Sequence, residues 1–101
     1  MTVILKLDRE REIRLNNRAV FEAETVTEKD LQTLINTPGV APLRALLWAG
    51  LRHEDKTISI SQVDDLMDAL REEGRLQELH TALTRALVEG KWIPASNPLE
   101  G

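Results

Sequence analysis

The spacing of apolar residues changes along the chain. In the first fifteen residues apolar side chains recur at every second position, first at Val3, Leu5 and Leu7 and then at Ile13 and Leu15. Alternation of this kind indicates β-strands, and the charged run between the two segments can turn the chain. We therefore predict a short hairpin over residues 1–15, with a charged helix over Asp8–Leu15 as the open alternative because Arg and Glu favour helices.

From Asn16 onward the apolar spacing is helical. Asn16 or Asn17 is a suitable N-cap for a helix through about Thr25 that buries Ala19, Val20 and Ala23. We expect the segment 27–30 to open a second helix, with acidic residues in its first turn and an apolar set of Leu31, Leu34 and Ile35. The sequence Asn36-Thr37-Pro38-Gly39 then ends that helix.

The segment from Pro42 to Arg52 is apolar on nearly every side. One stripe holds Leu43, Leu46, Leu47 and Leu51, and a second holds Ala45, Trp48 and Ala49. A helix that is apolar all round is a buried helix. We therefore place this helix at the centre of the core, with Trp48 inside it.

Two further helices follow a polar connection over residues 53–60, which we expect to place Ile58 or Ile60 in the core. Ser61 is the expected N-cap of the first, which repeats apolar residues at three-and-four spacing: Val63, Leu66, Met67 and Leu70. Gly74 interrupts the pattern, and a last helix then ends near Gly90.

The predicted fold is a mainly α, single-domain bundle of about five helices over residues 1–90. Because it contains Pro94 and Pro98, the segment 91–101 is predicted to be a flexible tail.

Composition narrows the possible functions. The chain has 101 residues, no Cys and a net charge of −4, which excludes disulfides and argues against neutralisation of nucleic-acid phosphates. Its longest apolar stretch is too short to span a membrane. The charge is uneven, with a net +1 over residues 1–52 and −5 over residues 53–101. We expect a soluble, intracellular protein without a nucleic-acid or membrane partner, whose acidic half steers basic partners.

No motif for catalysis, cofactor or metal binding is present. No serine lies in the sequence context of a hydrolase nucleophile, and every glycine is isolated, so no phosphate-binding loop is predicted. The segment from Asp55 to Ile60 is similar to the end of a calcium loop, but Leu51, Lys56 and Gln62 then stand where that loop needs a carboxylate, a glycine and a glutamate. We therefore expect a protein that is not an enzyme and holds neither metal nor cofactor.

The remaining candidates are protein-binding residues. Asp64, Asp68 and Glu72 share one face of a predicted helix, and together with Glu78 they form either a site for a basic partner or an ordinary solvated face. Trp92 and Ile93 follow the last helix, where an apolar pair either folds back or anchors a partner, as interface tryptophans often do.

The run Leu43-Arg44-Ala45-Leu46-Leu47-Trp48-Ala49-Gly50-Leu51, followed by Arg52-His53-Glu54-Asp55, resembles the tail assembly chaperones of long-tailed bacteriophages and prophages. The similarity is specific over residues 43–55 and looser over residues 12–90. In place of the glycine that follows the first helix in that family, this chain has Glu24-Thr25-Val26.

The resemblance implies a non-enzymatic, mostly helical protein in the cytoplasm of the bacterial host. Such proteins bind the tape measure protein and help the tail tube protein to assemble around it, without remaining in the virion. The alternative is a small helical adaptor or regulatory protein-interaction domain unrelated to phage. Either protein would bind a partner helix in a groove. The genomic neighbourhood separates the two, since a phage chaperone gene would have a tube gene upstream and a very long coiled-coil gene downstream.

Overall fold

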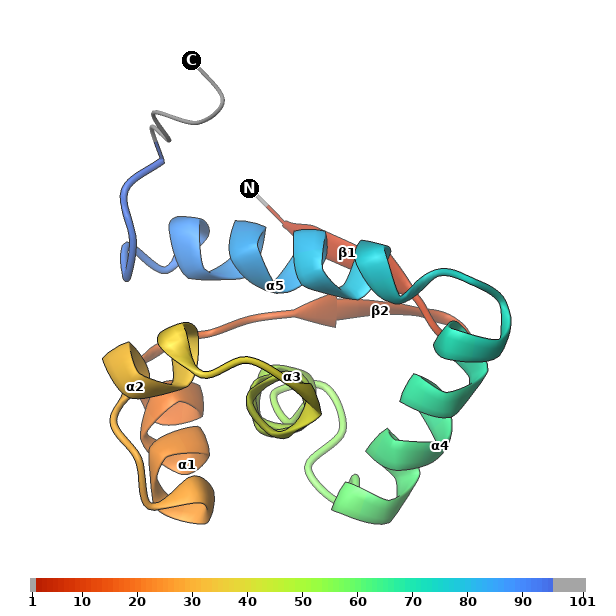
Figure 1. The fold of residues 1–101 in the computed structure, drawn as a ribbon, viewed down its shortest axis with the longest axis horizontal. Coiled ribbons are helices and arrows are strands. Elements are labelled where there is room, and N and C mark those ends of the chain that lie inside the picture. Colours follow the sequence, from red (N-terminus) through yellow and green to blue (C-terminus); the bar gives the residue numbers. More distant parts are fainter. Residues whose placement is uncertain (1, 96–101) are drawn as a thin grey trace.

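The computed structural model describes residues 2–95, which form a two-stranded hairpin and five helices (Figure 1). The elements, in chain order, are β1 Val3–Lys6, β2 Glu10–Ile13, α1 Asn17–Thr27, α2 Leu31–Asn36, α3 Val40–Leu51, α4 Ile60–Glu72 and α5 Leu76–Glu89. The hairpin lies between α5 on one side and α3 on the other (Figure 1). The predicted fold class, a small mainly α domain with an amino-terminal hairpin, is confirmed.

The hairpin is antiparallel, with Val3 opposite Ile13. Val3, Leu5 and Ile13 are buried, as the alternation predicted, while Ile4 on the other face of β1 is 47% exposed. The charged-helix alternative for Asp8–Leu15 is wrong. β2 begins at Glu10, earlier than expected, because Arg11 occupies an inward position of the strand and is only 7% exposed.

The turn between α1 and α2 differs from the prediction. α1 continues through the Glu24-Thr25-Val26 segment to Thr27, whose hydroxyl donates to the Ala23 carbonyl. Glu28 then takes a left-handed conformation, with a φ of 59°, and ends the helix. Residues 27–30 are therefore not a first helical turn, and Asp30 is the N-cap of α2, accepting a hydrogen bond from the Thr33 amide at 2.8 Å.

α3 is the central helix, and Figure 1 views it end-on with the other elements around it. Leu47 and Leu51 are 0% exposed, which confirms the prediction that this helix forms the centre of the core. Trp48 is only partly buried and packs against the edge of that core. Its indole N–H donates to the Ile58 carbonyl at 3.1 Å and so holds the α3–α4 loop, while Ile58 itself is buried, as one of the two predicted choices.

α4 begins at Ile60, and its N-cap is Ser59 rather than the predicted Ser61. The Ser59 hydroxyl accepts a hydrogen bond from the Gln62 amide at 3.0 Å, and the Gln62 side chain accepts one from the Ser59 amide at 2.8 Å. This reciprocal capping box satisfies two backbone N–H groups at once. Gly74, with a φ of 70°, separates α4 from α5, as expected.

Gly50 allows the hairpin to lie close to α3. A Cβ at this position would stand 2.8 Å from the Cγ2 of Ile13, which is too close for a real contact. The Gly50 carbonyl also accepts a hydrogen bond from the Arg14 amide at 3.0 Å. The backbone that leaves β2 is thus attached directly to the central helix.

Candidate protein-binding surfaces

The residues that follow α3 in the stretch resembling the phage family connect α3 to the hairpin. The ring nitrogen Nε2 of His53 lies 2.9 Å from the Glu12 carbonyl oxygen, and the Glu54 carboxylate accepts from the Glu12 amide at 3.2 Å. Asp55 pairs with Arg11 of β2 at 3.4 Å. The His-Glu-Asp turn after α3 therefore binds the second strand of the hairpin, and these side chains are engaged within the domain.

Arg11 has a second partner in the hairpin turn. Its Nε and Nη2 donate to the two carboxylate oxygens of Asp8, each at 2.8 Å. These charge-assisted hydrogen bonds lower the pKa of Asp8 from 3.8 to about 2. The buried guanidinium is thereby held between Asp8 and Asp55.

Three of the four predicted acidic binding residues are paired with arginines of the same chain. Asp64 accepts two hydrogen bonds from Arg44 of α3, at 2.7 and 2.9 Å, and Asp68 pairs with Arg71. Glu78 accepts from Arg75 at 2.8 Å. These arginines lower the pKa values of Asp64 and Glu78. Glu72 is exposed on α4 and forms no ion pair among residues 2–95.

Trp92 folds back onto the domain. Its indole N–H donates to the Leu15 carbonyl at 2.6 Å, and its backbone N–H donates to the Leu87 carbonyl at 2.9 Å. Gly90 permits this approach, since a Cβ there would stand 2.6 Å from the Leu15 oxygen. Ile93 is partly buried beside it. Of the two interpretations of this pair, the structure therefore favours the structural one. The tail predicted to be flexible covers residues 91–101. Within it, Trp92 and Ile93 pack against the core, while residues 96–101 lie outside the described residues.

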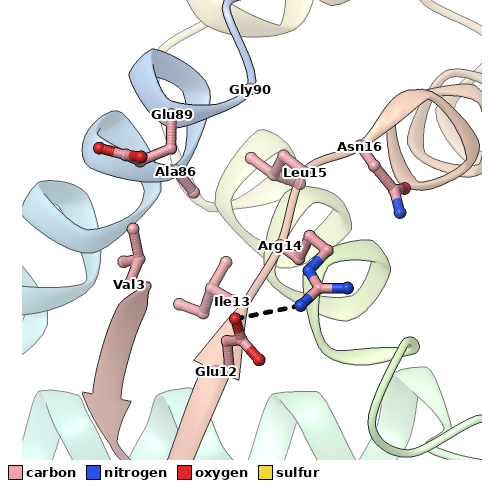
Figure 2. A pocket seen from close by; sticks show the side chains of 9 residues that line it. All are labelled: Val3, Glu12, Ile13, Arg14, Leu15, Asn16, Ala86, Glu89 and Gly90. Atoms are coloured by element: carbon pink, nitrogen blue, oxygen red, sulfur yellow. Dashed lines mark hydrogen bonds and ion pairs between the residues drawn. The ribbon is translucent and has the colours of Figure 1, made fainter. Parts of the chain in front are cut away.

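A pocket of about 280 Å³ lies where the hairpin meets the end of α5 (Figure 2). Apolar side chains such as Val3 and Ile13 lie inside it, while Arg14 and Glu89 lie on opposite sides (Figure 2). Arg14 pairs with Glu12 at 3.3 Å. The pocket is therefore a gap left where the hairpin packs against the end of α5, and polar side chains surround it.

An apolar groove of about 310 Å³ lies between α2, α3 and α5. Its apolar lining comes from all three helices and from the α2–α3 connection: Leu34, Ile35, Pro38, Pro42, Leu43, Leu46, Leu83 and Leu87. Ile35 was predicted to belong to the apolar set of its helix, yet it is 37% exposed at this groove. In the sequence, only the position of Ile35 in an apolar stripe indicated this groove. That position predicted a buried side chain rather than a surface one.

A second cleft, of about 480 Å³, lies between α1 and the α3–α4 loop, and its lining is basic. Four side chains with a full positive charge line it, from three separate segments of the chain: Arg14, Arg18, Arg52 and Lys56. Glu22 is the one carboxylate in the lining, and His53 stands beside it. We call this feature the basic cleft. Sequence reasoning missed it because no two of the four cations are adjacent in sequence.

Residues 2–95 contain no group of three or more His, Cys, Asp or Glu side chains placed to hold a metal ion. Over the same range, none of the helices combines the length and the apolar content needed to cross a membrane. Comparisons of the chain with family models, with curated proteins and with solved structures found no match.

Proposed function

We propose that this protein is a tail assembly chaperone of a long-tailed bacteriophage or prophage. In this role it is not an enzyme: it binds the tape measure protein in the cytoplasm of the bacterial host and assists assembly of the tail tube protein. The proposal is supported by the similarity of residues 43–55 to that family. These residues form most of α3 and the turn that binds it to β2, so the similarity covers the centre of the fold.

The apolar groove is the observation that carries the binding role. A tape measure protein is long and helical, so its chaperone must cover apolar stripes that repeat every three or four residues. A groove formed by three helices, with Ile35 partly exposed in its wall and Leu43 partly buried, offers apolar surface of that kind. Covering this surface with a client helix would bury it in the same way as the core of a helical bundle.

The acidic residues have a smaller part in this proposal. Asp64, Asp68 and Glu78 already accept hydrogen bonds from arginines, so a basic client would compete with those arginines for them. Exposed charges of this kind affect the rate of association and its salt dependence more than the affinity. We expect the groove to supply most of the binding free energy.

The test is co-expression in bacteria with the long helical protein encoded next to this one, scoring the solubility and co-purification of that protein. The wild-type chain should keep the client soluble. The double variant Ile35→Glu with Thr84→Glu places two charges on exposed positions of the groove and should abolish co-purification. Its matched control, Ile4→Glu with Thr81→Glu, changes two exposed residues outside the groove and should behave as wild type.

If the wild-type chain neither solubilises nor co-purifies with that client, the chaperone proposal is wrong. Capture of a different, unrelated helical protein through the same groove would then favour the helical adaptor. Equal loss of binding in both double variants would show that the groove is not the client site.

A further inference from the structure

The basic cleft stands out against the charge of the whole chain. Its lining carries four full positive charges and one negative charge, whereas the protein has a net charge of −4. The cations come from the segment after β2, from α1 and from the α3–α4 loop, with Ala19 and Ala49 between them. α1 and α3 are neighbouring helices, so the packing of these two helices brings the charges together. The fold therefore collects positive charge at one place.

Arg52 is held in a fixed orientation in this cleft. Its guanidinium lies 4.9 Å from the centre of the Trp48 ring, its Nε donates to Glu22 at 3.1 Å, and its Nη1 donates to the Lys56 carbonyl at 3.1 Å. Its Nη2 has no hydrogen-bond acceptor within the part of the chain that the structure describes. Since the side chain is already ordered, binding an acceptor at Nη2 costs little additional conformational entropy.

Two other cations of the cleft lack a counter-charge. Neither Arg18 nor Lys56 forms an ion pair with any residue between 2 and 95, and both are exposed. On the acidic face of α4, by contrast, Asp64 and Asp68 are paired with arginines, and Glu72 has no ion pair among the described residues. The basic cleft therefore gathers two exposed cations without a counter-charge in one lining, where an external anionic group can reach both.

We propose that the basic cleft binds an acidic segment of a partner protein, with side-chain carboxylates accepting hydrogen bonds from Arg18, Arg52 and Lys56. A carboxylate matches the planar fork of an arginine. This binding surface is additional to the apolar groove and does not depend on the identity of the client. A nucleic acid fits less well, because its continuous line of phosphates would meet Glu22 inside the cleft and a protein of net charge −4 outside it.

The experiment is an NMR titration of the ¹⁵N-labelled protein with a capped octaglutamate peptide, with octaglutamine as the uncharged control peptide. We expect chemical-shift changes confined to residues 14–22 and 48–56, including the Trp48 indole N–H. Octaglutamine should give none. A short DNA duplex, titrated under the same salt conditions, should bind more weakly than octaglutamate.

Paired variants test whether the cleft or the overall charge is responsible. Arg18→Glu with Lys56→Glu should weaken octaglutamate binding about tenfold or more, since each reversal replaces an attraction by a repulsion. Lys29→Glu with Arg85→Glu makes the same change of net charge at exposed cations outside the cleft and should alter the affinity less than about twofold. Arg18→Lys with Lys56→Arg keeps the charges and should retain binding.

Four results would overturn the proposal: no binding of octaglutamate, equal loss of affinity in the two charge-reversed variants, shift changes centred outside the cleft, or tighter binding of the duplex. The dispersion of the amide spectrum of each variant, recorded before the titration, shows that the variant is folded. None of these results depends on the tape measure protein, so failure here leaves the chaperone proposal to its own test.

Discussion

At the scale of single residues, the pairing of a side chain decides its role more than its charge does. Arg11 belongs to the run of charged residues that predicted the hairpin turn. In the structure it is nearly buried between Asp8 and Asp55. The run of charges located the turn correctly, but it could not show that Arg11 lies on the inner side of β2. That position follows from the register of the hairpin and from the turn after α3, which is far away in sequence.

The Asp8–Arg11 pair should make stability depend on pH in the acid range. The pKa of Asp8 is about 2 in the folded chain against 3.8 for an ordinary aspartate, so its contribution is present above that ordinary value and is lost as pH falls toward 2. We expect the urea midpoint of the wild-type protein to fall more steeply between about pH 4 and pH 2 than that of Asp8→Asn. Parallel pH profiles for the two proteins would show that the pair contributes nothing.

At the scale of elements, local pattern located the helices but not all of their ends. The apolar periodicity identified all five helices, although the first turn of α2 was placed too early, at residues 27–30. The caps were harder, because Ser59 and Ser61 are equally good N-cap residues by type. Gln62 decides between them, since it stands three residues after Ser59 and completes the capping box. The cap of this helix is therefore a local property, set by the three-residue spacing of Ser59 and Gln62.

The two serines give a matched pair of variants for α4. Ser59→Ala removes the hydroxyl that accepts from the Gln62 amide and should lower the free energy of unfolding by about 1 kcal/mol. Ser61→Ala changes an exposed position inside the first turn and should have little effect, because alanine is the better helix former. Urea titrations of both variants measure the difference. A larger loss for Ser61→Ala would instead make Ser61 the N-cap of this helix.

At the scale of the whole molecule, contacts between distant segments set both the stability and the surfaces. The indole N–H of Trp92 binds the Leu15 carbonyl and joins the residues after α5 to the chain leaving the hairpin. The basic cleft and the apolar groove are likewise made from segments that only the packing of the helices brings together.

Replacing Trp92 tests whether it closes the fold or binds the client. We expect Trp92→Ala to lower the melting temperature by roughly 5–10 °C, as expected for a loss near 1–2 kcal/mol in a domain of this size. Trp92→Phe, which keeps an aromatic ring and removes only the donor to Leu15, should lower it less. Calorimetry gives both values, and the solubility of the co-expressed client should follow stability. Unchanged stability with lost client solubility would instead make Trp92 a binding residue.

The sequence by itself determined the elements and the core of this protein. Periodicities of two and of 3.6 residues are local properties, and they are enough to identify the hairpin, the helices and the central position of α3. Tertiary structure alone decided the surfaces: which acids are neutralised by arginines, that Ile35 stays partly exposed, and that four scattered cations share one cleft. The physical reason is that hydrogen bonds and ion pairs act over a few ångströms in space, whatever the separation of the residues along the chain.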